Sequence, residues 1–260
     1  MKLLIKLKYN GGGFSGYQVQ QGRRTVQGEL CRAADELFQH RCSVTGCSRT
    51  DAGVHAECFC ATVTDAGSAA LTTTIPISRV PAAFNTHLPP DISVFDAAAV
   101  PDDFHPRYSV KEKTYIYRIL NTELRDPFFE GRAWFVNGVL LSAADIERMD
   151  IAASMLLGRH DFSSFMAAGS KIVDPVRTIT HASVREAGQI VEILVSADGF
   201  LYNMVRIIAG TLLDVGRGRT GPRDIPGIIE ARRRSAAGVT APPQGLYLHS
   251  VIYDEGPKAQ

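Results

Sequence analysis

The chain has 260 residues, of which 45% are hydrophobic and 21% charged, and its formal net charge is +1. These values are typical of a soluble globular protein with one large or two smaller domains, and they exclude a disordered or low-complexity chain. Residues 1–9 alternate lysines with apolar residues, which predicts a strand and not a signal peptide, and no run is long enough to span a membrane. We therefore expect a cytoplasmic protein. The five cysteines contain no Cys-x-x-Cys pair, so we expect neither a zinc site nor a disulfide framework.

The first half of the chain is predicted to follow the order strand, helix, strand, strand, helix, strand. The strands are expected over residues 1–9, from 44 onward, over 57–64 and over 92–99, and the helices over 25–40, with Thr25 as its cap, and 78–87. This order is that of a ferredoxin-like β-α-β-β-α-β unit. Residues 101–106 read as a connector to the second half.

The second half can be drawn with the same order of elements. It comprises a strand over 113–119, a helix over 142–157, a loop over 158–165, a hairpin of 177–185 and 190–197, a buried helix over 199–216, a short helix over 225–231 and a strand over 246–253. We therefore predict a mixed α/β (α+β) protein of two ferredoxin-like or RRM-like domains, residues 1–104 and 105–260. Their mainly antiparallel sheets are expected to adjoin, with a cleft between the domains.

The most informative segment is residues 46–56, Gly-Cys-Ser-Arg-Thr-Asp-Ala-Gly-Val-His-Ala. Its glycines and the apolar run that follows predict a turn at a sheet edge that displays Arg49, Asp51 and His55. Thr-Asp-Ala-Gly is also ordinary turn chemistry, so the segment taken alone favours a structural role.

Two later residues bear on Asp51. Arg206 lies within the helix that is apolar nearly all round, and a guanidinium at such a place needs a carboxylate partner. Tyr115 and Tyr117 share one face of their predicted strand with Ile119, and either one of these tyrosines stacks on a base or both belong to the core.

Residues 201–234 are basic, with seven arginines against three acidic residues. Arg217 and Arg219 are therefore candidates for phosphate contacts, whereas the run from Arg232 to Arg234, taken alone, is explained equally well as a solvated helix face. The glycine-rich residues 10–16 could also approach a ligand, but no Lys-Ser/Thr pair follows and the spacing matches no nucleotide-binding loop.

Seven motifs in the same order show that the chain resembles the tRNA pseudouridine synthase A family, whose members modify RNA without a cofactor. The motifs are residues 9–20, 46–55, 104–107, 113–117, 158–162, 203–206 and 244–248, and the resemblance covers nearly the whole length. The chain departs from the family at Tyr17, where Trp is common, and at Asn10, where Asp is common.

The resemblance implies a role for each site residue. Asp51 matches the essential aspartate, which attacks the flipped-out uridine as a nucleophile or, in a rival account, abstracts a proton to form a glycal. Arg206 matches the arginine that pairs with this aspartate and keeps it ionised, and Arg49 the residue that enters the RNA and holds the nucleotide out of its stack. Tyr115 matches the aromatic that stacks on uracil, and Leu246 an apolar residue of the uracil pocket. His55 receives no role and is expected to support the turn.

The resemblance also implies a homodimer that binds transfer RNA and isomerises uridines at positions 38, 39 and 40 of the anticodon stem-loop, with no metal and no cofactor. Two alternatives remain. One is a non-catalytic RNA-binding protein in which Asp51 and Arg206 form a structural pair. The other is a phosphate-handling enzyme that uses residues 10–16 as its cradle and Asp51 to hold magnesium.

Overall fold

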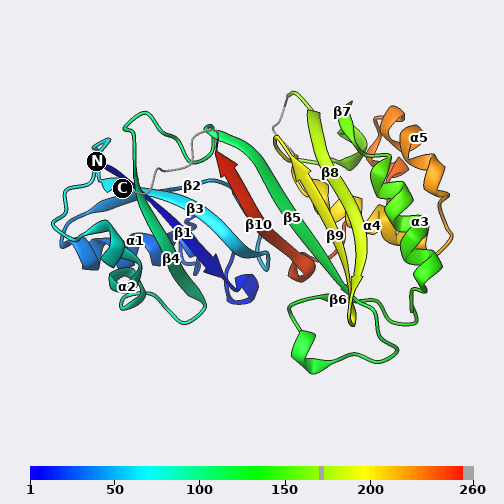
Figure 1. Ribbon diagram of the computed structural model, residues 1–260, viewed down its shortest axis with the longest axis horizontal. Helices are drawn as coiled ribbons and strands as arrows, with labels where there is room; N and C mark the ends of the chain where they lie inside the picture. Colours follow the sequence, from blue (N-terminus) through cyan, green and yellow to red (C-terminus); the bar gives the residue numbers. More distant parts are fainter. Residues whose placement is uncertain (170–172, 254–260) are drawn as a thin grey trace. The chain divides into compact units, whose positions relative to one another are not determined.

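The computed structural model describes residues 1–169 and 173–253, and the chain divides into two compact units (Figure 1). The first unit consists of Met1–Lys111 together with the end of the chain from Leu248, and the second of Glu112–Tyr247. The sequence places the boundary at 104/105 and assigns the last strand to the second domain, whereas most of that strand belongs to the first unit. No helix in the described residues has the length and apolar character needed to cross a membrane.

The first unit has the predicted order of elements. These are β1 (Lys2–Tyr9), α1 (Val26–Phe38), β2 (Cys42–Gly46), β3 (His55–Asp65), α2 (Val80–Asn85) and β4 (Ile92–Val100). The sheet order is β4-β1-β3, each pair antiparallel, and β2 pairs with the second half of β3, from Gly46 opposite Ala61 to Cys42 opposite Asp65. This arrangement is that of the predicted ferredoxin-like unit.

The core of the first unit lies between this sheet and its two helices. Leu3, Ile5 and Leu7 of the central strand are fully buried, and burying each such side chain contributes about 1.5–3 kcal/mol. Helix α1 begins after Thr25, whose hydroxyl accepts from the amide of Gly28, so the expected cap is confirmed. Helix α2 is shorter than the predicted 78–87, because a 3₁₀ turn precedes it and Pro81 stands in its first turn, where proline is tolerated.

The second unit contains the predicted hairpin and two additional short strands. Its elements are β5 (Val110–Leu120), β6 (Trp134–Phe135), α3 (Ala143–Ser154), β7 (Gly158–Asp161), β8 (Val176–Ala187), β9 (Ile190–Ala197), α4 (Met204–Gly216), α5 (Ile225–Glu230) and the start of β10 (Leu246–Tyr253). The sheet order is β5-β9-β8-β7 with antiparallel neighbours, and β6 runs parallel to the end of β5. The prediction of a loop over 158–165 is wrong in its first half, because β7 pairs with β8.

Helix α4 is buried on nearly every side, as predicted. All of its residues except Arg206 and Asp214 are buried. The helix starts at Met204, later than the expected residue 199, after Asn203 in the left-handed region with φ of 60°. A Cβ on Gly210 would lie 1.9 Å from the carbonyl oxygen of Val239, so this glycine lets the segment after α5 pack directly on the helix.

Candidate active site

Asp51 lies on a tight turn between β2 and β3. The amide of Val54 donates to the carbonyl oxygen of Asp51 at 3.2 Å, and Gly53 has a φ of 80°, which glycine adopts without strain. The side chain of Asp51 is half-buried, whereas that of Arg49 is exposed. The predicted turn that displays both residues is confirmed.

Thr50, the residue between Arg49 and Asp51 in the sequence, is buried and supports the turn. Its hydroxyl lies 2.8 Å from the hydroxyl of Tyr9 at the end of β1. Its carbonyl oxygen accepts from the amide of Tyr17 at 3.0 Å. Because Thr50 is held by both its side chain and its backbone, Asp51 has little freedom to move.

The glycine-rich segment packs on the same turn. The amide of Gly11 donates to Nδ1 of His55 at 3.0 Å, and a Cβ on Gly11 would lie 2.0 Å from the carbonyl oxygen of Val54. Gly16, with a φ of 92°, approaches the carbonyl oxygen of Thr50 in the same way. The absence of a side chain at Gly11 and Gly16 thus lets the backbone of the Asp51 turn pack against this segment. The amide of Gly11 already forms a hydrogen bond with His55. The supporting role expected for His55 is confirmed.

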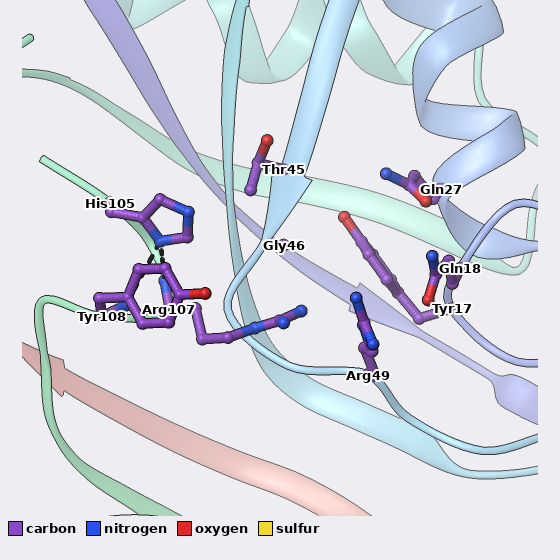
Figure 2. A pocket seen from close by; sticks show the side chains of 9 residues that line it. All are labelled: Tyr17, Gln18, Gln27, Thr45, Gly46, Arg49, His105, Arg107 and Tyr108. Carbon is purple, nitrogen blue, oxygen red and sulfur yellow. Dashed lines mark hydrogen bonds between the residues drawn. The ribbon is translucent and has the colours of Figure 1, made fainter. Parts of the chain in front are cut away.

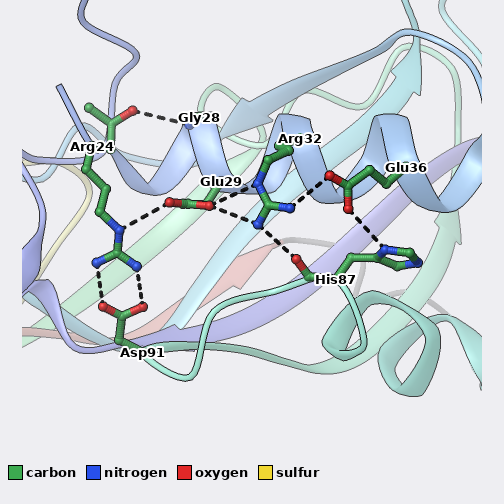
Figure 3. Close-up of polar contacts among 8 residues, drawn as sticks. Arg24, Gly28, Glu29, Arg32, Glu36, His87 and Asp91 are labelled. Atoms are coloured by element: carbon green, nitrogen blue, oxygen red, sulfur yellow. Dashed lines mark hydrogen bonds and ion pairs between the residues drawn. The ribbon is translucent and has the colours of Figure 1, made fainter. Parts of the chain in front are cut away.

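Charged residues fix the glycine-rich segment in turn (Figure 3). Arg24 forms two hydrogen bonds with the carboxylate of Asp91, at 2.7 and 2.9 Å, and a third with Glu29 at 3.1 Å. Its guanidinium lies 4.2 Å from the centre of the Phe14 ring, and the carbonyl of Asp91 accepts from the amide of Asn10. Exposed ion pairs contribute little individually, but this bidentate clamp holds both ends of the segment on which the Asp51 turn rests.

The second unit holds the other predicted site residues on β5, α4 and β10. Tyr115 of β5 is 7% exposed, and its ring meets that of Phe200 edge to face with centroids 5.0 Å apart. Leu246 opens β10 and is also 7% exposed. Each of the two side chains therefore offers only a small exposed surface.

Arg206 stands in the first turn of α4 and is half-buried. Its Nε donates to the carbonyl oxygen of Ala241 at 2.7 Å, and its Nη1 donates to Oδ1 of Asn203 at 2.8 Å. The amide of Ala241 donates back to the carbonyl oxygen of Arg206 at 3.0 Å. These bonds fix the direction of the guanidinium, while the expected pairing with a carboxylate remains a prediction.

Tyr117 links this arginine to the strand that carries Tyr115. Its ring is fully buried, and its hydroxyl donates to the carbonyl oxygen of Pro242 at 2.7 Å. Burial raises the pKa of Tyr117 well above its usual range, and the nearby charge of Arg206 opposes this shift. Tyr117 is therefore the structural tyrosine of β5, and it anchors the segment that leads to Leu246.

The arginines considered for phosphate contact lie at the end of α4. Both Arg217 and Arg219 are exposed. Nη1 of Arg219 lies 3.4 Å from Oδ1 of Asp214, so part of its charge is already compensated.

A polar pocket of about 190 Å³ lies beside Arg49 in the first unit (Figure 2). Its lining residues come from four segments of the sequence and are Tyr17, Gln18, Gln27, Thr45, Gly46, Arg49, His105, Arg107 and Tyr108. Tyr17 is 2% exposed and stacks on Phe59 with ring centroids 4.5 Å apart, so this departure from the family pattern is accommodated as a wall of the pocket.

Comparison with known proteins identifies the family of the chain. A family model described as tRNA pseudouridine synthase matches residues 7–109 and 152–254 of the chain. The chain belongs to the tRNA pseudouridine synthase family. As a member of this family it is an isomerase that converts uridine to pseudouridine in tRNA.

Individual relatives agree with the family model. The tRNA pseudouridine synthase A 2 of Clostridium tetani is 40% identical over 252 residues, which cover 96% of this chain and 98% of the relative. The tRNA pseudouridine synthase A of Bacillus licheniformis is 43% identical, with coverage of 98% and 100%. Among solved structures, a Cbf5-Nop10-Gar1 complex is only distantly similar, with 11% identity and a TM-score of 0.41 over 97% of this chain and 50% of that chain.

In this pseudouridine synthase, the sequence identified the displayed side chains better than the residues that hold them. The contact of Gly11 with His55 joins positions 44 residues apart, and periodicity carries no signal for such a pair. The sequence marks residues 104–107 as a motif and places most of it in the connector 101–106, although His105 and Arg107 line the pocket beside Arg49. The signal for them was a histidine and an arginine on either side of a proline.

Proposed function

We propose that Asp51 is the catalytic residue of this tRNA pseudouridine synthase and that it acts on uridines 38, 39 and 40 of the anticodon stem-loop. The observation that carries the proposal is the support of the Asp51 turn by Thr50 and by the glycine-rich segment. A carboxylate on a turn fixed in this way is pre-organised to react as a nucleophile or a base.

The reaction needs no water and no change in oxidation state. The ionised carboxylate of Asp51 either attacks the sugar or removes a proton from it, so that the bond between the sugar and the base nitrogen breaks. The freed uracil turns and rejoins the sugar through a ring carbon, which then loses its proton. Asp51 is regenerated, and atoms and charge balance over the cycle.

The second unit supplies the surroundings of the base in this proposal. Tyr115 stacks on the uracil, Leu246 packs against it, and Arg206 pairs with Asp51 and favours its ionised form. The hydrogen bonds of Arg206 to Ala241 and Asn203 support its assignment, because they orient the guanidinium before substrate arrives.

Arg49 is proposed to hold the target nucleotide out of its stack. Its exposure and its position two residues before Asp51 support this role. Flipping is required because a carboxylate on a protein surface cannot reach a sugar carbon inside a stacked stem. We further propose that the enzyme acts in the cytoplasm and that it forms a homodimer. Equilibrium sedimentation of the full chain will test the homodimer.

The test of Asp51 is release of tritium from anticodon stem-loop RNA labelled at the uracil ring carbon that loses its proton. The wild-type chain should release the label, and Asp51→Asn and Asp51→Ala should each be slower by at least about 1,000-fold, because they lack the reacting carboxylate. RNA in which uridines 38, 39 and 40 are replaced one at a time identifies the positions used.

Asp103→Asn is the matched control, since Asp103 is an exposed aspartate of the same unit. It should retain wild-type rates, and all variants should bind RNA. Undiminished release by Asp51→Asn would refute the assignment and favour a non-catalytic Asp51–Arg206 pair. Release that persists after all three uridines are replaced would refute the positions.

A further inference from the structure

The pocket beside Arg49 carries positive charge without compensation. Arg49 and Arg107 both line it, and Figure 2 shows the Arg107 side chain extending across the end of β2 toward Arg49. Within the described residues neither guanidinium forms an ion pair, and no carboxylate belongs to the lining. Two arginines that share a pocket in this way repel one another, and an anion placed between them removes the repulsion.

The size and polarity of the pocket restrict this anion to a small group. Pockets for small organic molecules usually measure roughly 300–1,000 Å³ and are mostly apolar. This one measures about 190 Å³, and its lining is dominated by side chains that donate hydrogen bonds, including Gln18 and Thr45. A phosphate group, with its charge and its several acceptor oxygens, matches such donors better than a base does.

Arg107 is held by a rigid backbone on both sides. The hydroxyl of Tyr253 donates to the carbonyl oxygen of Pro106 at 2.8 Å, directly before the arginine. The amides of Arg107 and Tyr108 both donate to Nδ1 of His105, at 3.1 and 3.3 Å. The segment is thus ordered before any ligand arrives, which lowers the entropic cost of binding.

His105 adds a neutral donor to the pocket. Partial burial lowers the pKa of His105, and the positive charges of Arg107 and Lys2 lower it further. In the neutral ring, Nδ1 accepts from two amides, so the proton resides on Nε2.

The rim of the pocket favours a phosphate that belongs to RNA over a free ion. Tyr108 is 78% exposed, and its ring lies over that of His105 with centroids 4.3 Å apart. An exposed aromatic ring beside arginines is the combination that proteins use to stack a nucleotide while its backbone is neutralised.

We propose that this pocket binds one backbone phosphate of the tRNA substrate and that Arg107 is its principal contact. The phosphate lies next to the nucleotide that Arg49 holds, so this inference rests on the proposed role of the Asp51 turn. Arg107 contributes affinity and fixes the register of the RNA, and it takes no part in the chemical step.

The first test is the salt dependence of binding between the full chain and the anticodon stem-loop RNA. Arg107→Gln should lower the slope of log affinity against log salt by about 0.7–0.9, the loss expected for one phosphate contact. Arg107→Lys retains the charge and should retain the slope. Arg79→Gln is the matched control, because Arg79 is an exposed arginine of the same unit without an ion pair in the described residues. A wild-type slope for Arg107→Gln would overturn the proposal.

The second test replaces single phosphates of the RNA by uncharged methylphosphonates. One replacement should weaken binding to the wild-type chain about tenfold or more and have little effect on Arg107→Gln. If Arg107→Gln melts at a clearly lower temperature, Arg107→Met, which keeps the length of the side chain without its charge, takes its place and should likewise show little penalty at that phosphate. Equal penalties in wild type and variant at every phosphate would overturn the proposal.

Two further arms separate related explanations. Inorganic phosphate is titrated at constant ionic strength; if it binds in an Arg107-dependent manner while no methylphosphonate matters, the pocket is a free-phosphate site and the proposal is wrong. Asp51→Asn is taken through the same scan and should keep the Arg107-dependent phosphate. If Asp51→Asn loses activity but gives the same methylphosphonate scan as the wild type, both the catalytic role of Asp51 and the phosphate site are supported. If Asp51→Asn retains activity, only the catalytic role of Asp51 is refuted.

Discussion

The amide of Gly11 donates to Nδ1 of His55 across 3.0 Å and thereby joins the glycine-rich segment to the turn that carries Asp51. Both partners are buried, so the bond is shielded from water. The backbones of Gly11 and Val54 lie so close together that there is no room for a Cβ on Gly11. The position of Asp51 therefore depends on a residue that lies 40 positions earlier in the chain.

Gly11→Ala is expected to reduce activity by displacing this turn. The new Cβ would lie 2.0 Å from the carbonyl oxygen of Val54, and backbone cannot move aside as a side chain can. Such overpacking costs about 1–3 kcal/mol of the free energy of unfolding, or more. Tritium release should fall more strongly than RNA affinity, since the proposed role of Asp51 needs its accurate placement and phosphate contacts do not.

The neighbouring Gly12→Ala provides the control. Its Cβ would meet only Oδ1 of Asn10, at 3.3 Å, and that exposed side chain can shift. Melting temperature and release rate should therefore stay near those of the wild type. If Gly11→Ala behaves like Gly12→Ala in both measurements, the glycine-rich segment does not position the turn.

The pH dependence of stability should depend on Glu192 of β9. This buried carboxylate accepts from Arg118 of β5 at 3.1 Å and from Arg185 of β8 at 2.7 Å. Burial raises the pKa of Glu192, but the two arginines outweigh burial and lower the pKa below its ordinary value of 4.5. The stabilisation is therefore fully present above the unfolded pKa and is lost as the pH falls through the folded one.

Glu192→Gln should lower the free energy of unfolding at pH 7 by about 1–3 kcal/mol. The difference from the wild type should shrink below pH 4.5, where the wild-type carboxylate takes up a proton. Thermal unfolding between pH 7 and pH 3 measures this, with the exposed Glu186→Gln as control. A difference that is constant over this range would show that the ion pairs contribute nothing to stability.

Local signals in the sequence predicted the regular elements well. The hydroxyl of Ser142 accepts from the amide of Asp145, and the amide of Ser142 donates to the carboxylate of Asp145, as their spacing predicts. Gly188 turns the hairpin with a φ of 64°. The two short strands β6 and β7 were missed, because they exist only through their pairing with β5 and β8. A strand of two or four residues has too few side chains to show a period.

The candidate site could be predicted only in part for the same reason. The sequence indicates Asp51 because glycines flank the charged residues of its turn and an apolar run follows. It indicates Arg206 because a charged residue stands within an otherwise apolar helix. Arg107 became visible only when residues far apart in the sequence were found to line one pocket. Contacts of this kind depend on the sheet register, which a single sequence does not contain.

The contribution of the basic segment at the end of α4 should differ between its two candidate arginines. Arg219 is paired with Asp214, with 3.4 Å between Nη1 and Oδ1, so removing it also frees a carboxylate that repels RNA. Arg217 has no ion pair in the described part of the chain. If both contact phosphates, Arg217→Gln should lower the salt slope by about 0.7–0.9. Arg219→Gln should do the same and, in addition, weaken binding further at low salt, where the freed carboxylate of Asp214 repels the RNA.

Asp214→Asn provides the opposite test, because it releases Arg219 without changing the arginines. RNA should bind more tightly to this variant at low salt, and the gain should shrink as salt screens the charges. Filter binding over a range of potassium chloride concentrations measures all three variants. An affinity of Asp214→Asn equal to that of the wild type, together with unchanged slopes for both arginine variants, would place the end of α4 outside the RNA path. Arg217 and Arg219 would then be ordinary solvated residues at the end of the helix.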